Sequence, residues 1–168
     1  MREVKFKIYD KQEKKFLIKN QKVKNGDIKS ILNEIIDLEE YSVQINNPEE
    51  NRYEFLQSTE IKDMNGKEIY EGDILLSTTE DGVFLISIGF GYSEKDNDIL
   101  GAFKLKIEKQ LALSQYFEDF DDNLIKLVNK YNIPIEENNI KCINDGWWIV
   151  GNVYENPELL GDDKNVEV

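Results

Sequence analysis

Closely spaced glycine turns in the middle of the chain constrain its fold more than any other feature of the sequence. Asn65-Gly66 and Asp81-Gly82 each supply the positive φ angles of a tight hairpin turn. Gly72-Asp73 interrupts the strand pattern between them and indicates a further tight turn. Several short strands joined by such turns are typical of a small, strongly bent barrel. We therefore expect a β-barrel over residues 53–160.

A smaller α+β part precedes the expected barrel, over residues 1–52. Residues 4–8 alternate apolar and charged side chains, which predicts a half-buried strand, and residues 15–18 predict the returning strand of a hairpin. Apolar side chains then recur at helical spacing after Asp27, a suitable N-cap, so we expect a helix over 27–39. The fold class is therefore mainly β with some α.

Residues 108–132 interrupt the β pattern, because their apolar side chains recur at helical spacing until Pro134. Asp121, Asp122 or Asn123 could cap a short helix within this stretch. We expect one or two helices inserted into the barrel and lying outside its folding core. Residues 161–168 form a polar, acidic tail.

The residue types present exclude several classes of function. The chain has no histidine, which excludes Ser-His-Asp and Cys-His nucleophile systems and every histidine metal site. The single cysteine, Cys142, excludes an internal disulfide, and we interpret it as a buried structural thiol. No nucleotide-binding or HExxH motif occurs. We therefore assign no catalytic residue, no cofactor and no metal ligand.

Charge is distributed unevenly along the chain, whose net charge is −13. Residues 1–24 carry 9 basic and 3 acidic side chains, whereas the remaining 144 residues carry 12 basic and 31 acidic ones. Because DNA affinity depends on lysine and arginine neutralising phosphates, we expect no direct DNA binding. No apolar run has the length of a membrane span or a signal peptide, so we expect a cytoplasmic protein without membrane contact.

Three segments carry more specific patterns: residues 1–6, residues 61–74 (IKDMNGKEIYEGDI) and residues 150–160 (VGNVYENPELL). In order and spacing they resemble the YopX family of phage and prophage proteins. The resemblance implies an SH3-like β-barrel after a small N-terminal part, and an origin in a phage or prophage of a Gram-positive bacterium. The protein is then expected in the cytoplasm of the host bacterium. The family has no established activity, so it supplies no catalytic residues, and residues 108–132 are absent from its shorter members.

The motif residues favour a structural interpretation. Asn65-Gly66 forms the hairpin turn, Gly72 allows a backbone angle that a Cβ would hinder, and Asp73 accepts backbone N–H bonds in its turn. Asp63 with Asn65-Gly66 is only a weak match to part of a calcium loop.

The candidate partner contacts lie elsewhere. Trp147 and Trp148 are adjacent on a predicted strand, so one indole should enter the core while the other faces outward or packs beneath neighbouring segments. The stretch around residue 120 carries four carboxylates in five positions: Glu118, Asp119, Asp121 and Asp122.

Two functions of different class remain. The first is a non-enzymatic binding or accessory module whose acidic surface contacts a basic host or phage protein. The alternative is a metal-assisted hydrolase that uses carboxylates, since paired carboxylates can hold Mg²⁺ or Ca²⁺. Neither the partner nor the oligomeric state follows from the sequence, and self-association stays open.

Overall fold

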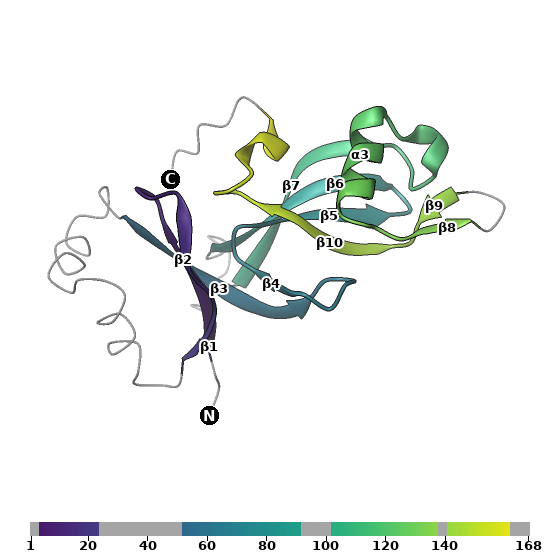
Figure 1. Ribbon diagram of the computed structural model, residues 1–168. Helices are drawn as coiled ribbons and strands as arrows, with labels where there is room; N and C mark the ends of the chain where they lie inside the picture. The colour runs from purple at the N-terminus through teal and green to yellow at the C-terminus, as the bar shows by residue number, and fades with distance from the viewer. Residues whose placement is uncertain (1–3, 24–51, 92–101, 138–140, 162–168) are drawn as a thin grey trace, which may run out of the picture. The chain divides into compact units, whose positions relative to one another are not determined.

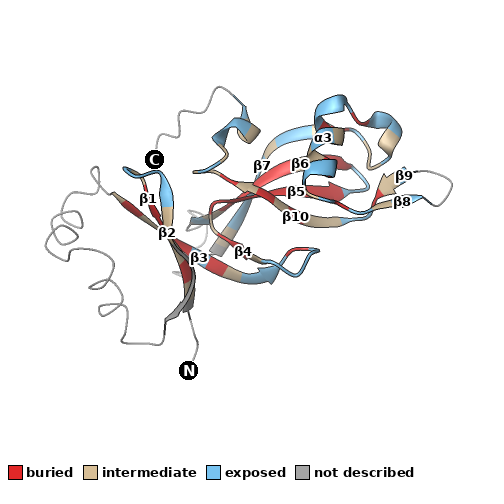
Figure 2. Cartoon of the chain, viewed as in Figure 1, coloured by how far each residue is buried: buried red, intermediate tan, exposed pale blue. Residues whose placement is uncertain are grey.

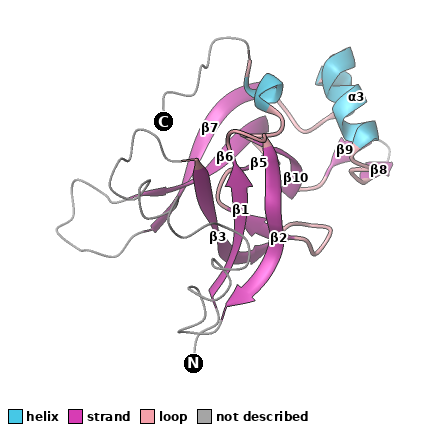
Figure 3. Cartoon of the chain, turned by 60° about the vertical axis from the view of Figure 1, so that its left-hand side comes forward, coloured by secondary structure: helices cyan, strands magenta, loops and turns pink. Residues whose placement is uncertain are grey.

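The structure is a computed structural model that describes residues 4–23, 52–91, 102–137 and 141–161 (Figure 1). These residues are mainly β-strand, with one α-helix and two short 3-10 helices among them (Figure 3). The chain divides into two compact units, residues 1–58 and residues 59–168. The boundary lies inside a strand, a few residues beyond the expected end of the N-terminal part at residue 52.

The first unit is built on an antiparallel hairpin of β1 (Val4–Asp10) and β2 (Lys15–Val23). The first residues of β3 (Tyr53–Lys62) pair antiparallel with the other edge of β1, so that Ile8 lies opposite Phe55. The hairpin predicted from the sequence is therefore present. The helix expected over 27–39 lies outside the described residues.

Asp10 closes the hairpin turn of the first unit. Its buried carboxylate accepts the backbone N–H groups of Gln12 and Glu13 and a two-pronged interaction from Arg52, whose Nη2 lies 2.8 Å from Oδ2. Burial alone would raise the pKa of Asp10, but the hydrogen bonds and charge of Arg52 and the two backbone donors outweigh it and lower the pKa below 3.8. Asp10 therefore stays ionised and ties the turn to the residue that precedes β3.

The second unit contains an antiparallel four-stranded sheet in the order β10-β5-β6-β7. Its strands are β5 (Asp73–Thr79), β6 (Gly82–Gly91), β7 (Ala102–Ala112) and β10 (Gly146–Asn152). Shifts of register interrupt the β6–β7 and β10–β5 ladders, and such bulges bend a sheet. The sheet is accordingly curled, and β5 at its centre is buried along nearly its whole length (Figure 2).

Smaller elements surround this sheet. β4 (Glu68–Tyr70) follows the Asn65-Gly66 turn and pairs with β3, and β8 (Ile135–Glu137) pairs with β9 (Lys141–Ile143). The helical elements are η2 (Phe117–Asp119), α3 (Asp122–Lys130) and η3 (Pro157–Leu160). Pro157 begins η3, a position at which proline is favoured because its missing N–H has no partner within the helix.

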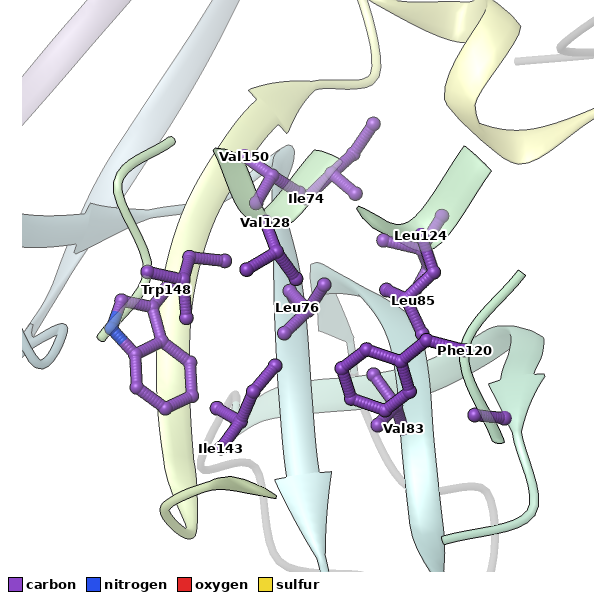
Figure 4. Packing of buried hydrophobic residues seen from close by; sticks show 12 residues of the cluster. Ile74, Leu76, Val83, Leu85, Phe120, Leu124, Val128, Ile143, Trp148 and Val150 are labelled. Atoms are coloured by element: carbon purple, nitrogen blue, oxygen red, sulfur yellow. The ribbon is translucent and has the colours of Figure 1, made fainter. Parts of the chain in front are cut away.

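Alternation along the strands divides the apolar side chains of the second unit between two clusters. The main cluster joins side chains of β5, β6 and β10 to side chains of the α3 region (Figure 4), and it comprises Ile74, Leu76, Val83, Leu85, Ala112, Phe120, Leu124, Val128, Ile133, Ile143, Trp148 and Val150. The second cluster is formed by Ile69, Leu75, Ile86 and Ile88. Since Leu75 and Leu76 are neighbours on β5, the two clusters lie on opposite faces of the sheet.

The helical insertion expected over 108–132 needs two corrections. Residues 108–112 continue β7 and pair with β6, because the ladder overrides a short and ambiguous apolar pattern. Helix α3 is also part of the core: Leu124 and Val128 are 2% and 1% exposed within the main cluster. The apolar stripe of α3 covers the sheet face that carries Ile74 and Leu76, which would otherwise be open to water.

Gly72 occupies a position that a larger residue cannot adopt without strain. Its φ is +77°, and a Cβ built there would lie 3.1 Å from the Tyr154 ring and 3.3 Å from Asn152 Nδ2. Its N–H donates to Ile88 O at 2.7 Å and its carbonyl accepts from Val153 N at 2.8 Å. The backbone of this tight turn thus forms hydrogen bonds both with β6 and with the residue that follows β10.

Replacing Gly72 by valine is expected to destabilise the protein by about 1–3 kcal/mol, because a β-branched residue is strained at positive φ and crowds Tyr154. Gly89→Ala is the matched control, since a Cβ at Gly89 meets no atom within 4 Å. Thermal melting of both variants measures the difference. Equal melting temperatures for Gly72→Val and the parent protein would contradict the importance of this backbone angle.

Candidate functional site

The four carboxylates predicted as a contact lie together at the start of α3 and in the residues just before it. Glu118, Asp119, Asp121 and Asp122, here termed the acidic turn, are all exposed. They surround Phe120, which is 8% exposed in the main cluster and lies 5.4 Å from the ring of Phe117. A buried aromatic anchor therefore holds a short, highly charged surface segment in place.

Three of these carboxylates also have local structural roles. Asp121 is the N-cap of α3, and its Oδ1 accepts the backbone N–H of Leu124 at 2.7 Å. Asp119 accepts a hydrogen bond from the hydroxyl of Ser114. Asp122 lies in the first turn of α3, where a negative charge interacts favourably with the helix dipole. The hydrogen bonds accepted by Asp119 and Asp121 thus hold the acidic turn in place.

A pocket of about 340 Å³ adjoins the acidic turn and shares Asp121 with it. Leucine side chains of β6, β7, α3 and η3 supply its apolar lining, while Lys109, Asn123 and Glu158 add polar groups. An apolar pocket beside a charged surface can bind an apolar side chain of a partner, and the charged groups can orient that partner.

The carboxylates of the described residues do not form a metal centre. In the four described ranges, no three Asp, Glu or Cys side chains gather in a group that could hold a metal ion. Asp63, the weak match to part of a calcium loop, has a structural role instead. Both oxygens of its carboxylate already accept backbone N–H groups, those of Asn65, Lys67 and Ile149, at 2.9, 2.8 and 3.2 Å.

Asp63 is a structural residue that the sequence-based assignment of sites missed. Its carboxylate joins the Asn65-Gly66 turn to β10, and the Met64 N–H adds a bond of 2.9 Å to the carbonyl of Trp147. An aspartate two residues before Asn-Gly is the pattern of an Asx turn, which could have indicated the local part of this role. The bond to Ile149 spans 86 residues and has no local pattern.

Asp73, one of the predicted turn residues, lies in a buried polar arrangement. Its Oδ2 accepts Tyr70 N at 2.8 Å and its Oδ1 accepts Asn152 Nδ2 at 3.2 Å. Burial, with the negative charges of Glu68 and Asp73, raises the pKa of Tyr70 to about 12. The Tyr70 hydroxyl therefore stays protonated at neutral pH and contributes no charge.

The two tryptophans face opposite clusters. Trp148 is 1% exposed in the main cluster, so it presents no surface to a partner (Figure 4). Trp147 is half-buried against the second cluster. Cys142 on β9 is also half-buried, whereas we expected a buried thiol. Of the predicted contacts, the acidic turn therefore offers the most accessible surface.

The molecule is a mainly β protein whose curled sheet carries one described α-helix and an exposed acidic turn. The model of the YopX protein family matches residues 5–161, so the chain belongs to this family. No curated protein matches the chain.

One solved structure with similarity over most of its length is the crystal structure of protein EF1440 from Enterococcus faecalis. It is 21% identical, with a TM-score of 0.41, and the match covers 94% of this chain and 97% of that one. In the described part of the chain, no helix has the length and apolar character needed to cross a membrane.

Proposed function

We propose that this YopX protein is a non-enzymatic binding module that contacts a basic phage or host protein through its acidic turn. The proposal includes an origin in a phage or prophage, action in the cytoplasm of the host bacterium, and an SH3-like form of the curled sheet. The observation that carries it is the acidic turn itself. Its four exposed carboxylates are held on the core by Phe120 and the Asp121 cap, beside a leucine-lined pocket.

The physical argument rests on charge and on rigidity. A chain with net charge −13 attracts basic proteins over a distance of about one Debye length, roughly 8 Å at physiological salt. Complementary charge mainly raises the rate of encounter and selects among partners. A contact segment that is already ordered loses less conformational entropy on binding than a mobile one. The acidic turn meets both conditions, because its hydrogen bonds fix it before any partner arrives.

The test uses a triple variant that removes charge and keeps the helix cap: Glu118→Gln, Asp119→Asn and Asp122→Asn. Glu80→Gln, Asp81→Asn and Glu155→Gln form a control with the same change of charge at three other exposed positions. The partner is first isolated from infected cells with the tagged chain, and the kinetics of binding to the purified partner are then measured. We expect the triple variant to lower the on-rate about tenfold and the control to have a much smaller effect.

Salt provides the second measurement of the same claim. Between about 50 and 500 mM salt the on-rate for the parent protein should fall steeply, and the triple variant should show a shallower dependence. A partner whose affinity changes neither with salt nor with these substitutions would overturn the proposal. Tight binding to bare duplex DNA at physiological salt would also overturn it.

A further inference from the structure

Strand β7 is the last strand of the four-stranded sheet in the second unit, as far as the described residues show. The strand order β10-β5-β6-β7 gives β7 a single neighbour, β6, among the described strands. β7 is also long, with 11 residues from Ala102 to Ala112. An edge of this length presents a row of backbone N–H and C=O groups to which another extended chain can pair.

One face of this edge is apolar and exposed. Leu105 and Ile107 are 53% and 67% exposed, although they lie opposite Ile88 and Ile86 of the second cluster in the β6–β7 ladder. They therefore extend an apolar face of the sheet outward to its last strand. Nearby, Phe103 and Phe90 stack edge to face at 5.3 Å, and Phe90 is itself 40% exposed. Neighbouring exposed apolar side chains of this kind are typical of an interaction surface.

The opposite face of the edge is basic, unlike the chain as a whole. Lys104 and Lys106 alternate with the apolar residues, and Lys109 follows. The only acidic residue of β7 is Glu108, whose side chain is 4% exposed, accepts a hydrogen bond from Ser87 and lies 3.3 Å from Lys106. Strand β7 itself therefore carries three lysines and one glutamate, in a protein whose net charge is −13.

The bulge in β7 limits which part of the edge can pair. The register with β6 shifts between Ile107 and Lys109, so a regular ladder ends there. Residues 102–107 remain as a regular run with alternating lysine and apolar side chains. Edge lysines oppose pairing between two copies of the same strand, because like charges then approach each other. The same lysines favour an acidic strand.

We propose that residues 102–107 of β7 bind an extended acidic segment of a partner by strand addition. The apolar side chains of that segment lie against Leu105 and Ile107, and its carboxylates lie on the side of Lys104 and Lys106. This interface is separate from the acidic turn and opposite to it in charge. It goes beyond the proposed function and shares no residue with it, so either can fail alone.

The probes are three synthetic peptides of equal length. One alternates glutamate with valine, and one alternates lysine with valine. The third is the glutamate peptide with its two central valines replaced by proline, which has no backbone N–H for strand pairing. Fluorescence anisotropy measures their binding to the full chain. Net charge alone favours the lysine peptide, so a preference for the glutamate peptide reports the local lysines.

Variants then place the binding on β7. Lys104→Gln with Lys106→Gln should weaken binding of the glutamate peptide about tenfold, and Leu105→Ser should weaken it independently. Lys126→Gln with Lys130→Gln on the exposed face of α3 is the matched control and should leave binding unchanged. Thermal melting verifies that every variant is folded. Equal binding of the glutamate, lysine and proline peptides would overturn the proposal, as would equal effects of the two lysine pairs.

Discussion

Replacing Leu124 by alanine is expected to lower the free energy of unfolding by about 2–5 kcal/mol, because Leu124 is 2% exposed in the main cluster and its loss leaves a cavity between α3 and the sheet. Urea denaturation followed by tryptophan fluorescence measures the change, since Trp148 belongs to the same cluster.

Lys126→Ala is the matched control on the same helix. Lys126 is exposed, and alanine is a strong helix former, so the free energy of unfolding should change by less than about 0.5 kcal/mol. If Leu124→Ala were as stable as this control, α3 would be an appendage of the sheet, and the placement of the helix in the core would be wrong.

Replacing Asp63 by alanine is expected to cost about 2–4 kcal/mol. The substitution removes three hydrogen bonds, from the N–H groups of Asn65, Lys67 and Ile149 to the buried carboxylate, and a hydrogen bond to a charged group contributes roughly 1.5–3 kcal/mol. Chemical denaturation gives the magnitude, and hydrogen exchange at Ile149 should accelerate because the link between the turn and β10 is lost.

Asp81→Ala provides the comparison for Asp63→Ala. Asp81 also precedes a glycine turn, but it is exposed, so its loss should change stability by only a few tenths of a kcal/mol. Similar destabilisation by the two substitutions would show that the position in a turn matters and that the three hydrogen bonds of Asp63 do not.

The turns of the fold were the part most open to prediction from sequence, because their chemistry is local. Asn65-Gly66, Gly72-Asp73 and Asp81-Gly82 each lie at a turn, and Gly66, Gly72 and Gly82 all have positive φ. Only glycine adopts such angles without strain, so these positions can be recognised without knowledge of the rest of the chain. The hairpin of β1 and β2 could also be predicted from local signals, namely the alternation of apolar and charged residues and a polar turn.

The role of residues 108–132 could not be predicted, because it depends on contacts far apart in the chain. The apolar residues around Leu111 fit both a strand and a helix, and only pairing with β6 decides for β7. The helix itself was recognisable from its spacing. Its place in the core was not, because the sheet face beneath it comes from strands more than 30 residues earlier and from β10 later in the chain.

The candidate site was predictable in composition but not in arrangement. The four carboxylates in five positions can be read directly from the sequence. The adjoining pocket, which Asp121 helps to line, cannot, because it forms only where β6, β7, α3 and η3 meet. The position of Lys104 and Lys106 at the edge of the described sheet could not be predicted from the sequence either. These lysines alternate with apolar residues, which is typical of a strand, but nothing local shows that this strand has a single neighbour among the described strands.

Hydrogen exchange of the full chain, measured by mass spectrometry with and without its purified basic partner, tests the central claim most directly. The account predicts that added protection is concentrated in residues 114–124, around the acidic turn, and that the triple variant at Glu118, Asp119 and Asp122 loses it. Residues 76–86, which include the control positions Glu80 and Asp81, should exchange at the same rate in both states. Protection confined to other segments, with residues 114–124 unchanged, would contradict the assignment of the acidic turn as the contact.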